Sequence, residues 1–268
     1  MIEVIQTSYE PLYVGLSLFC AFMGAYTALS CVHRLLGFRK THFHHRLDRL
    51  MGKSVATAVP STQMYYATLL VGGVAFGGLG VWAMHFIGTL ALRMPIAVNY
   101  SISYTLLSFL AAAFAASLGL GIVAVNPNST PRLVIAGAVL GLGVSTMHYL
   151  GMGSMNFDGF FVWNWGLVVL SCMVAFAAST VALKLAFATE SNHARMVAAV
   201  LMGGAVGAMH YTGMAAANVV CSTSVPLQTL DDTGAISMPQ MPVLLVLLVV
   251  IVSFLLALDR MYTQQFRQ

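Results

Sequence analysis

Long apolar runs separated by short polar stretches dominate the chain. Each run is about 20 residues or longer, enough to cross the ~30 Å hydrocarbon core of a bilayer as a helix. Inside lipid every backbone N–H and C=O group must be paired, and runs without polar–apolar alternation favour helices over a barrel. The pattern predicts an all-α membrane protein with seven transmembrane helices, at 12–36, 64–91, 101–125, 132–155, 162–188, 195–217 and 242–262.

The composition agrees with a membrane environment. Of 268 residues, 59% are hydrophobic and 7% are charged, whereas soluble domains carry about 25% charged residues. The first eleven residues contain Glu3 and Glu10 but no basic residue and no short apolar core, so we expect the first helix to be retained and not cleaved as a signal peptide. We therefore predict one membrane domain over 1–268, with no soluble output domain.

The basic residues predict the orientation of these helices. Eleven of the twelve fall on one side, namely Arg34, Arg39, Lys40, Arg46, Arg49, Lys53, Arg132, Lys184, Arg195, Arg260 and Arg267. Only Arg93 falls on the other side, together with five of the eight acidic residues. Because cytoplasmic loops carry an excess of Lys and Arg, we predict an N-out, C-in topology. The net charge of +4 follows from this topology and does not indicate nucleic-acid binding.

A motif of the form G-x5-M-H-[FY]-x-G occurs three times, at 78–88, 141–151 and 203–213. Its histidines are 63 and 62 residues apart, a spacing that corresponds to one pair of helices. After the first helix we therefore expect three helix-pair repeats, at approximately 64–125, 132–188 and 195–262. Repetition at this period predicts three equivalent sites at one membrane depth.

The candidate ligands are the motif histidines His85, His148 and His210. A single histidine in a membrane helix is usually a satisfied polar residue, but three at equal depth indicate function. Glycines in the motif permit close helix approach, which would bring the three helices around one axis. Five methionines are further candidates: Met84, Met147 and Met209 directly precede a histidine, and Met152 and Met214 follow one turn later. Thr89 occupies the position that matches Met152 and Met214.

These side chains favour copper. Thioether sulfur is a soft ligand that suits Cu(I), and imidazole suits copper as well as zinc, iron and nickel. Zinc prefers cysteine, histidine and carboxylate ligands. The motif segments 78–88, 141–151 and 203–213 contain no carboxylate, so zinc is the less favoured metal. No Ser/His/Asp arrangement, carboxylate pair or phosphate loop is present, and we do not expect an enzyme.

The segment Met209-His210-Tyr211-Thr212 resembles the signature of the MHYT family of bacterial integral membrane sensor domains. The segments at 84–87 and 147–150 resemble its other two copies. The resemblance implies a metal, copper among the candidates, bound through the motif's His and Met residues at the outer face. It further implies a sensor of oxygen, carbon monoxide, nitric oxide or redox state in the bacterial inner membrane, with a periplasmic N-terminus and a cytoplasmic C-terminus. Family members often carry cyclic-di-GMP or kinase output domains after the last helix.

Several functional alternatives stay open at this point. A copper transporter or copper-handling chaperone would need polar or sulfur groups that continue inward from the site, and the sequence places few there. The chain could also be the sensor fragment of a longer cyclic-di-GMP or kinase signalling protein, or a scaffold whose motifs only pack helices. As partners we expect the lipid bilayer, a diatomic gas and a cytoplasmic signalling protein, while the sequence does not indicate an oligomeric state.

Overall fold

The computed structural model describes residues 2–4, 8–51, 62–94, 96–188, 191–222 and 235–237, together with residues 245, 247, 251 and 254. Within these residues, six helices are long and apolar enough to cross a membrane. They span Pro11–Phe38, Thr62–Leu90, Ile102–Val125, Thr130–Gly153, Trp165–Ala188 and Asn192–Ala215. The chain is a multi-pass membrane protein, as the hydropathy pattern predicts. The seventh expected helix, at 242–262, lies outside the described residues apart from four isolated positions.

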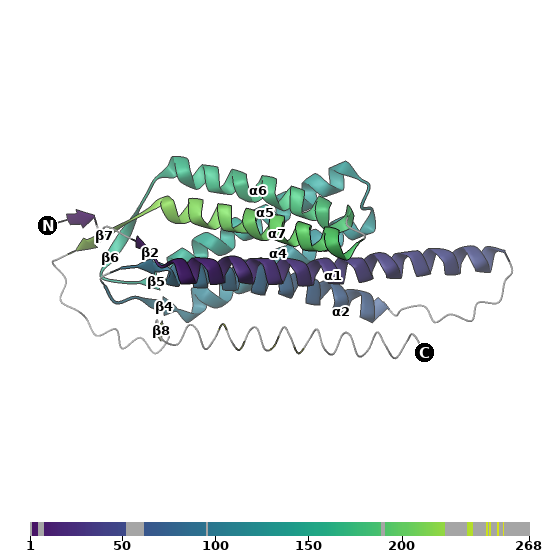
Figure 1. The fold of residues 1–268 in the computed structure, drawn as a ribbon, viewed down its shortest axis with the longest axis horizontal. Helices are drawn as coiled ribbons and strands as arrows, with labels where there is room; N and C mark the ends of the chain where they lie inside the picture. The colour runs from purple at the N-terminus through teal and green to yellow at the C-terminus, as the bar shows by residue number, and fades with distance from the viewer. Residues whose placement is uncertain are drawn as a thin grey trace.

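The helices form one bundle (Figure 1). They are α1 (Pro11–Leu50), α2 (Thr62–Gly73), η1 (Val74–Ala83), α3 (Met84–Leu90), α4 (Ile102–Val125), α5 (Thr130–Gly153), α6 (Trp165–Ala188) and α7 (Asn192–Ala215). The segments α2, η1 and α3 follow one another without a break and make up the second span, in which η1 is a π-helix. Sequence features mark the first residues of two helices. Pro131 lies in the first turn of α5, and the Ser191 hydroxyl caps α7 by accepting a hydrogen bond from the Ala194 N–H.

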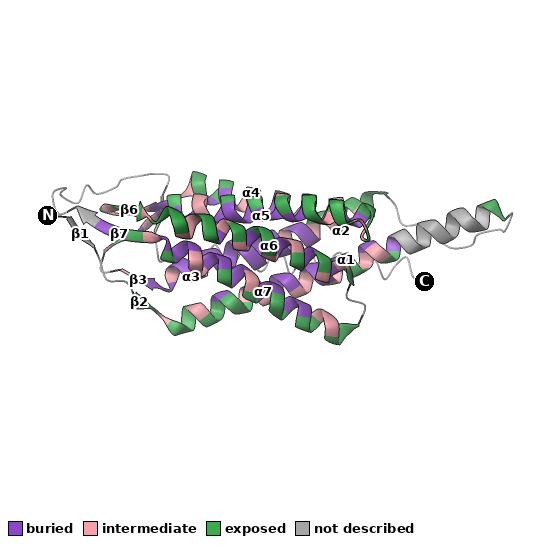
Figure 2. Ribbon diagram, turned by 90° about the horizontal axis from the view of Figure 1, so that it is seen from above, coloured by how far each residue is buried: buried purple, intermediate pink, exposed green. Residues whose placement is uncertain are grey.

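The spans close into a ring. Helix α1 packs on α7 and η1, α4 packs on η1 and α5, and α6 packs on α5 and α7. The spans that carry the motif are the more buried ones. In the 18-residue apolar stretch of each span, 72%, 50% and 50% of the residues are buried, against 33%, 44% and 28% for α1, α4 and α6. The outer faces of α4 and α6 are exposed (Figure 2), and the exposed residues include large apolar ones such as Leu110, Phe114 and Met173. Apolar surface of this extent fits a lipid environment.

Short strands gather at one end of the bundle (Figure 1). They are β1 (Ile2–Val4), β2 (Ser8–Tyr9), β3 (Leu92–Arg93), β4 (Asn99–Ser101), β5 (Met155–Asn156), β6 (Gly159–Trp163), β7 (Ala217–Ser222) and β8 (Ala235–Ser237). Each motif helix runs into a strand, β3, β5 or β7, and that strand pairs with β2, β4 or β6 respectively. The pairing defines three strand–helix–helix–strand units at 8–93, 99–156 and 159–222, which are called the first, second and third repeats from here on. They keep the expected period but start one helix earlier than the repeats expected from the sequence.

Three features differ from the sequence-based expectation. The strands were not predicted, because two to six residues are too few to leave a periodic signal. The π-helix was not predicted either, since its composition resembles that of an α-helix. Helix α1 continues to Leu50 instead of ending near 36. Charged residues mark where a chain leaves the membrane, but Phe43, Leu47 and Leu50 keep a helical apolar spacing beyond that point.

Candidate metal centre

The three motif histidines meet on the bundle axis at the strand end. His85 on α3, His148 on α5 and His210 on α7 are 0%, 0% and 1% exposed. Their Nδ1 atoms form a triangle with sides of 3.1, 3.2 and 3.3 Å. The structure therefore brings together the three side chains that the repeated motif singled out, one from each repeat.

Each imidazole ring packs against a motif glycine at the ring edge that faces away from the centre. The Nε2 atom of each histidine lies against the glycine three residues after the histidine of another repeat, so close that a methyl group on that glycine would overlap it. The three pairs are His85 with Gly151, His148 with Gly213, and His210 with Gly88. Each repeat thus supplies one histidine to the centre and one glycine to a neighbour's histidine. The motif glycine is needed for the site itself as well as for helix approach.

The triangle fits a metal ion. Its sides of 3.1–3.3 Å place the centre about 1.9 Å from each Nδ1 atom, close to the ~2.0 Å nitrogen–metal distance of histidine sites. The three Nε2 atoms are buried and have no hydrogen-bond partner among the described residues, and an unsatisfied buried polar atom costs about 1–3 kcal/mol. Nδ1 atoms this close to one another can share either a metal ion or a hydrogen-bonded proton.

All five candidate methionines are buried, with exposures of 0–3%. Met152 and Met214 line a cavity of about 250 Å³ at the strand end, together with Tyr9 and Phe161. Met209 instead lines an apolar cavity that extends away from the strands. The methionines after and before a histidine therefore reach opposite sides of the imidazole triangle in the third repeat, and their role as ligands stays a prediction.

The aromatic residue after each histidine anchors the motif helix to an outer helix in two repeats. Tyr149 bonds to Ser171 of α6 at 2.6 Å, and Tyr211 bonds to Ser17 of α1 at 2.8 Å. Each serine donates its own proton to the carbonyl three residues earlier, at 2.8 and 2.7 Å, so the tyrosine is the donor. We did not predict these serines from the sequence.

The first repeat uses the equivalent serine differently. Ser108 lies 22 residues after Phe86, just as Ser171 lies 22 residues after Tyr149. That spacing is a sequence signal that could have located both serines. Because Phe86 has no hydroxyl, Ser108 accepts from the indole N–H of Trp82 at 3.0 Å.

Two hydroxyl groups lie beside the first repeat where the others have sulfur. Thr89 replaces the methionine one turn after the histidine and donates to the Phe86 carbonyl at 2.8 Å. Tyr100 of β4 is fully buried and packs its ring on Phe86, but its hydroxyl has no hydrogen-bond partner among the described residues. Burial raises the pKa of Tyr100 to about 12, although the nearby Thr89 hydroxyl acts in the opposite direction. The environment of the centre is therefore not threefold symmetric.

Fold and site together define a multi-pass membrane domain in which three repeats each present a histidine to a common centre. Residues 78–137 and 141–199 match the family model MHYT, described as the bacterial signalling protein N terminal repeat. The chain belongs to the MHYT family. Both matched stretches begin at the first glycine of a motif, and the third motif begins in the same way at Gly203.

Several curated signalling proteins are similar to this chain. The bifunctional diguanylate cyclase/cyclic di-GMP phosphodiesterase MucR of Pseudomonas aeruginosa is 33% identical over 216 residues, which cover 79% of this chain and 28% of MucR. The cyclic di-GMP phosphodiesterase NbdA of the same organism is 29% identical, covering 82% and 26%. The signaling protein YkoW of Bacillus subtilis is 32% identical, covering 71% and 24%. The chain spans about a quarter of the length of these relatives. No solved structure matches it.

Proposed function

We propose that this domain is a membrane sensor that binds a metal ion, preferably copper, between His85, His148 and His210. The observation that carries the proposal is the approach of three buried Nδ1 atoms to within 3.3 Å of one another. Copper is preferred over zinc because the surrounding side chains offer thioether sulfur and no carboxylate. When bound, copper supplies an open coordination position and a one-electron couple, which suit the sensing of a diatomic gas or of redox state.

The orientation of the site is part of the proposal. Arg93 lies at the strand end with the histidines, where it pairs with Glu10. Arg132 and Arg195 lie near the starts of α5 and α7, at the opposite end of the bundle from the strands. From the positive-inside rule we infer that the strand end faces the periplasm of a bacterial inner membrane.

The signal would pass along the motif helices. Since each imidazole rests on a glycine of another repeat, any change at the centre that moves one ring also moves the helix that carries the glycine. Relatives named as cyclic di-GMP enzymes suggest the type of output that such a shift would control. We therefore propose that the chain works as the sensor part of a signalling protein, or with a separate cytoplasmic partner.

Transport of copper is the weaker alternative. On the side of the centre away from the strands, Phe76, Leu140 and Met202 line apolar cavities that no charged side chain reaches among the described residues. A permeating ion needs polar or charged groups along its path. Uptake of copper into sealed vesicles that contain the protein would support transport over sensing.

Metal content tests the proposal. We expect detergent-purified protein to hold copper in a fixed ratio, and a variant with all three histidines changed to alanine to hold none. His193→Ala is a suitable control, because His193 is exposed at the start of α7. Retention of copper by the triple variant, or absence of copper from copper-loaded wild-type protein, would refute the assignment.

A further inference from the structure

We propose that two apolar cavities inside the bundle are docking sites for an apolar diatomic gas, which reaches them sideways from the bilayer between α6 and α7. This inference deepens the proposed sensing function, because it assigns the route by which the gas approaches the histidine centre. The cavities lie on the side of the centre opposite the strands, and the ligand follows from their shape and chemistry.

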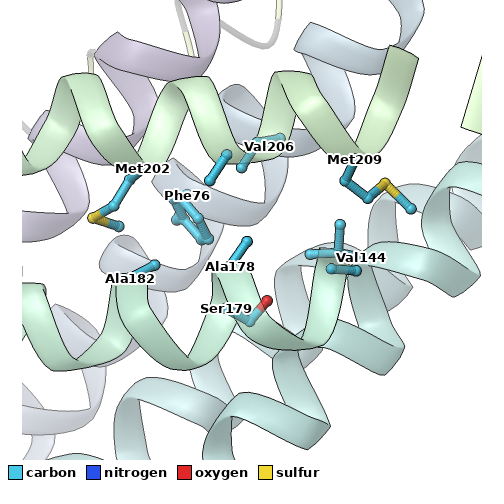
Figure 3. Close-up of a pocket in the computed structure, with 10 residues that line it drawn as sticks. Phe76, Val144, Ala178, Ser179, Ala182, Met202, Val206 and Met209 are labelled. Atoms are coloured by element: carbon cyan, nitrogen blue, oxygen red, sulfur yellow. The ribbon is translucent and has the colours of Figure 1, made fainter. Parts of the chain in front are cut away.

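Side chains of η1, α5, α6 and α7 line the first cavity, and Met209 is among them. Its wall is formed by Phe76 of η1, Val144 of α5 and Met202, Val206 and Met209 of α7, with α6 opposite (Figure 3). Met209 precedes His210 in the chain, so the cavity reaches the residue adjacent to the candidate ligand. Nine of the ten lining residues are apolar, and Ser179 is the exception.

The second cavity continues the first one deeper into the bundle. The two share Phe76, Ala182 and Met202 as lining residues. Beyond these, Leu29 and Val32 of α1 complete a wall that is apolar throughout. The side chains of Phe76 and Met202 therefore separate two spaces that lie one after the other along the bundle.

The size and polarity of the cavities select the ligand. Each has a volume of about 10 Å³, which is about the smallest space that holds one water-sized molecule, so a diatomic molecule or a xenon atom enters only with slight outward movement of the lining side chains. Apolar cavities stay dry because water would lose its hydrogen bonds there, whereas an apolar guest such as xenon binds. An oxygen, carbon monoxide or nitric oxide molecule likewise gives up no strong hydrogen bonds on entering an apolar cavity, whereas an ion would lose its hydration.

Small side chains form the part of the first cavity that faces the lipid. Ala178 of α6 and Ala205 of α7 line it and are partly exposed, unlike the buried Val206 and Met209. A methyl group is the smallest side chain that closes such a gap, so small helix movements open it. An apolar gas dissolves in the bilayer more readily than in water, and this gap faces that reservoir.

Xenon under pressure tests the docking sites on metal-free protein. We expect a xenon atom in the first cavity of crystals of the wild-type protein, and its loss in Ala178→Leu, whose larger side chain fills the gap. Ala177→Leu is the matched control, because Ala177 is exposed on the same helix and does not line the cavity. A second variant, Val206→Ala, enlarges the cavity and should raise xenon occupancy. Absence of xenon from both wild-type protein and Val206→Ala would overturn the proposal.

The route is tested with carbon monoxide on Cu(I)-loaded protein. We expect Ala178→Leu to slow carbon monoxide association several-fold at unchanged copper content, while Ala177→Leu keeps the wild-type rate. Equal rates in the two variants would show that the gas takes another path and would overturn the inferred route. If Cu(I)-loaded protein bound no carbon monoxide at all, the proposed sensing function would fail, while xenon in the cavity would still support the docking sites.

Discussion

The first repeat and the other two repeats place their histidines alike but surround them differently. In the second and third repeats, a tyrosine follows the histidine and bonds to a serine of an outer helix. In the first repeat the corresponding residue is Phe86, and the equivalent serine, Ser108, accepts a hydrogen bond from Trp82 instead. The three Nδ1–Nδ1 distances nevertheless differ by only 0.2 Å, between 3.1 and 3.3 Å. The geometry of the centre thus depends on what the repeats share, which is the histidine and the glycine three residues later.

The difference between the repeats gives the centre one distinct side. Met152 and Met214 bring sulfur to the strand end of two repeats, while Thr89 and Tyr100 bring hydroxyl groups to the first. Among the described residues, the π-helix η1 also occurs in the first repeat only, directly before Met84. Since π-helical turns are frequent at functional sites, the first repeat is where we expect an interaction that the other two do not make.

The largest effect is expected from removal of single histidines. Because the three Nδ1 atoms are equivalent in the triangle, His85→Ala, His148→Ala and His210→Ala should each weaken copper binding by more than the ~100-fold that loss of a supporting residue can cost. Competition with a copper chelator measures the affinity. If His85→Ala alone kept wild-type affinity, the first repeat would not contribute to the centre.

The glycines that support the imidazoles come next. Gly151→Ala puts a methyl group into the space of the His85 ring and should weaken copper binding about 10–100-fold, as loss of ligand orientation does. Gly88→Ala and Gly213→Ala should act alike through His210 and His148. Gly204→Ala is the control, since nothing lies within 4 Å of a methyl group at that position of α7. An unchanged affinity in all three motif variants would contradict the supporting role of the glycines.

Phe86→Tyr tests whether the first repeat tolerates the residue of the other two. Phe86 is fully buried and Ser108 already accepts from Trp82, so the new hydroxyl lacks the serine that tyrosine uses elsewhere. We expect the free energy of unfolding to fall by about 1–3 kcal/mol, measured in mixed detergent micelles. Wild-type stability would mean that Ser108 can serve both side chains.

Loss of a tyrosine hydroxyl should have the smallest effect on the free energy of unfolding, and the size of that effect should differ between the three tyrosine positions. Tyr149→Phe and Tyr211→Phe each remove one hydrogen bond and should cost about 0.5–1.5 kcal/mol, because Ser171 and Ser17 keep their bonds to backbone carbonyls. The Tyr100 hydroxyl lies near Thr89 but meets hydrogen-bond geometry with none of the described residues. Tyr100→Phe should therefore leave stability unchanged or slightly raised. Equal losses at all three sites would show that Tyr100 has a partner after all.

The sequence predicted the parts of the molecule that depend on hydropathy and repetition. Apolar runs of membrane-spanning length and a recurrent motif were sufficient to place His85, His148 and His210 at one depth around one axis. The nearness of each histidine to a glycine of another repeat could not be predicted, because it depends on the rotation of each helix about its own axis. A shift of one residue rotates a side chain by about 100° around the helix, and composition does not fix that angle.

Other features had no usable signal or a misleading one. The strands are too short to show alternation, and they form because the chain ends that leave adjacent helices lie side by side. The end of α1 was misplaced because charged residues at 34–40 mark the membrane boundary and not the end of a helix. The serine partners did have a signal, in the equal spacing of Ser108 and Ser171 from the preceding motif. The orientation in the membrane and the metal stay predictions.

X-ray absorption at the copper edge of copper-loaded protein tests the central claim most directly. If the triangle of Nδ1 atoms holds the ion, the spectrum will show three nitrogen neighbours at about 2.0 Å with the multiple scattering typical of imidazole rings. Additional sulfur would identify methionine ligands without weakening the claim. A copper environment of sulfur or oxygen alone, with no imidazole contribution, would contradict it.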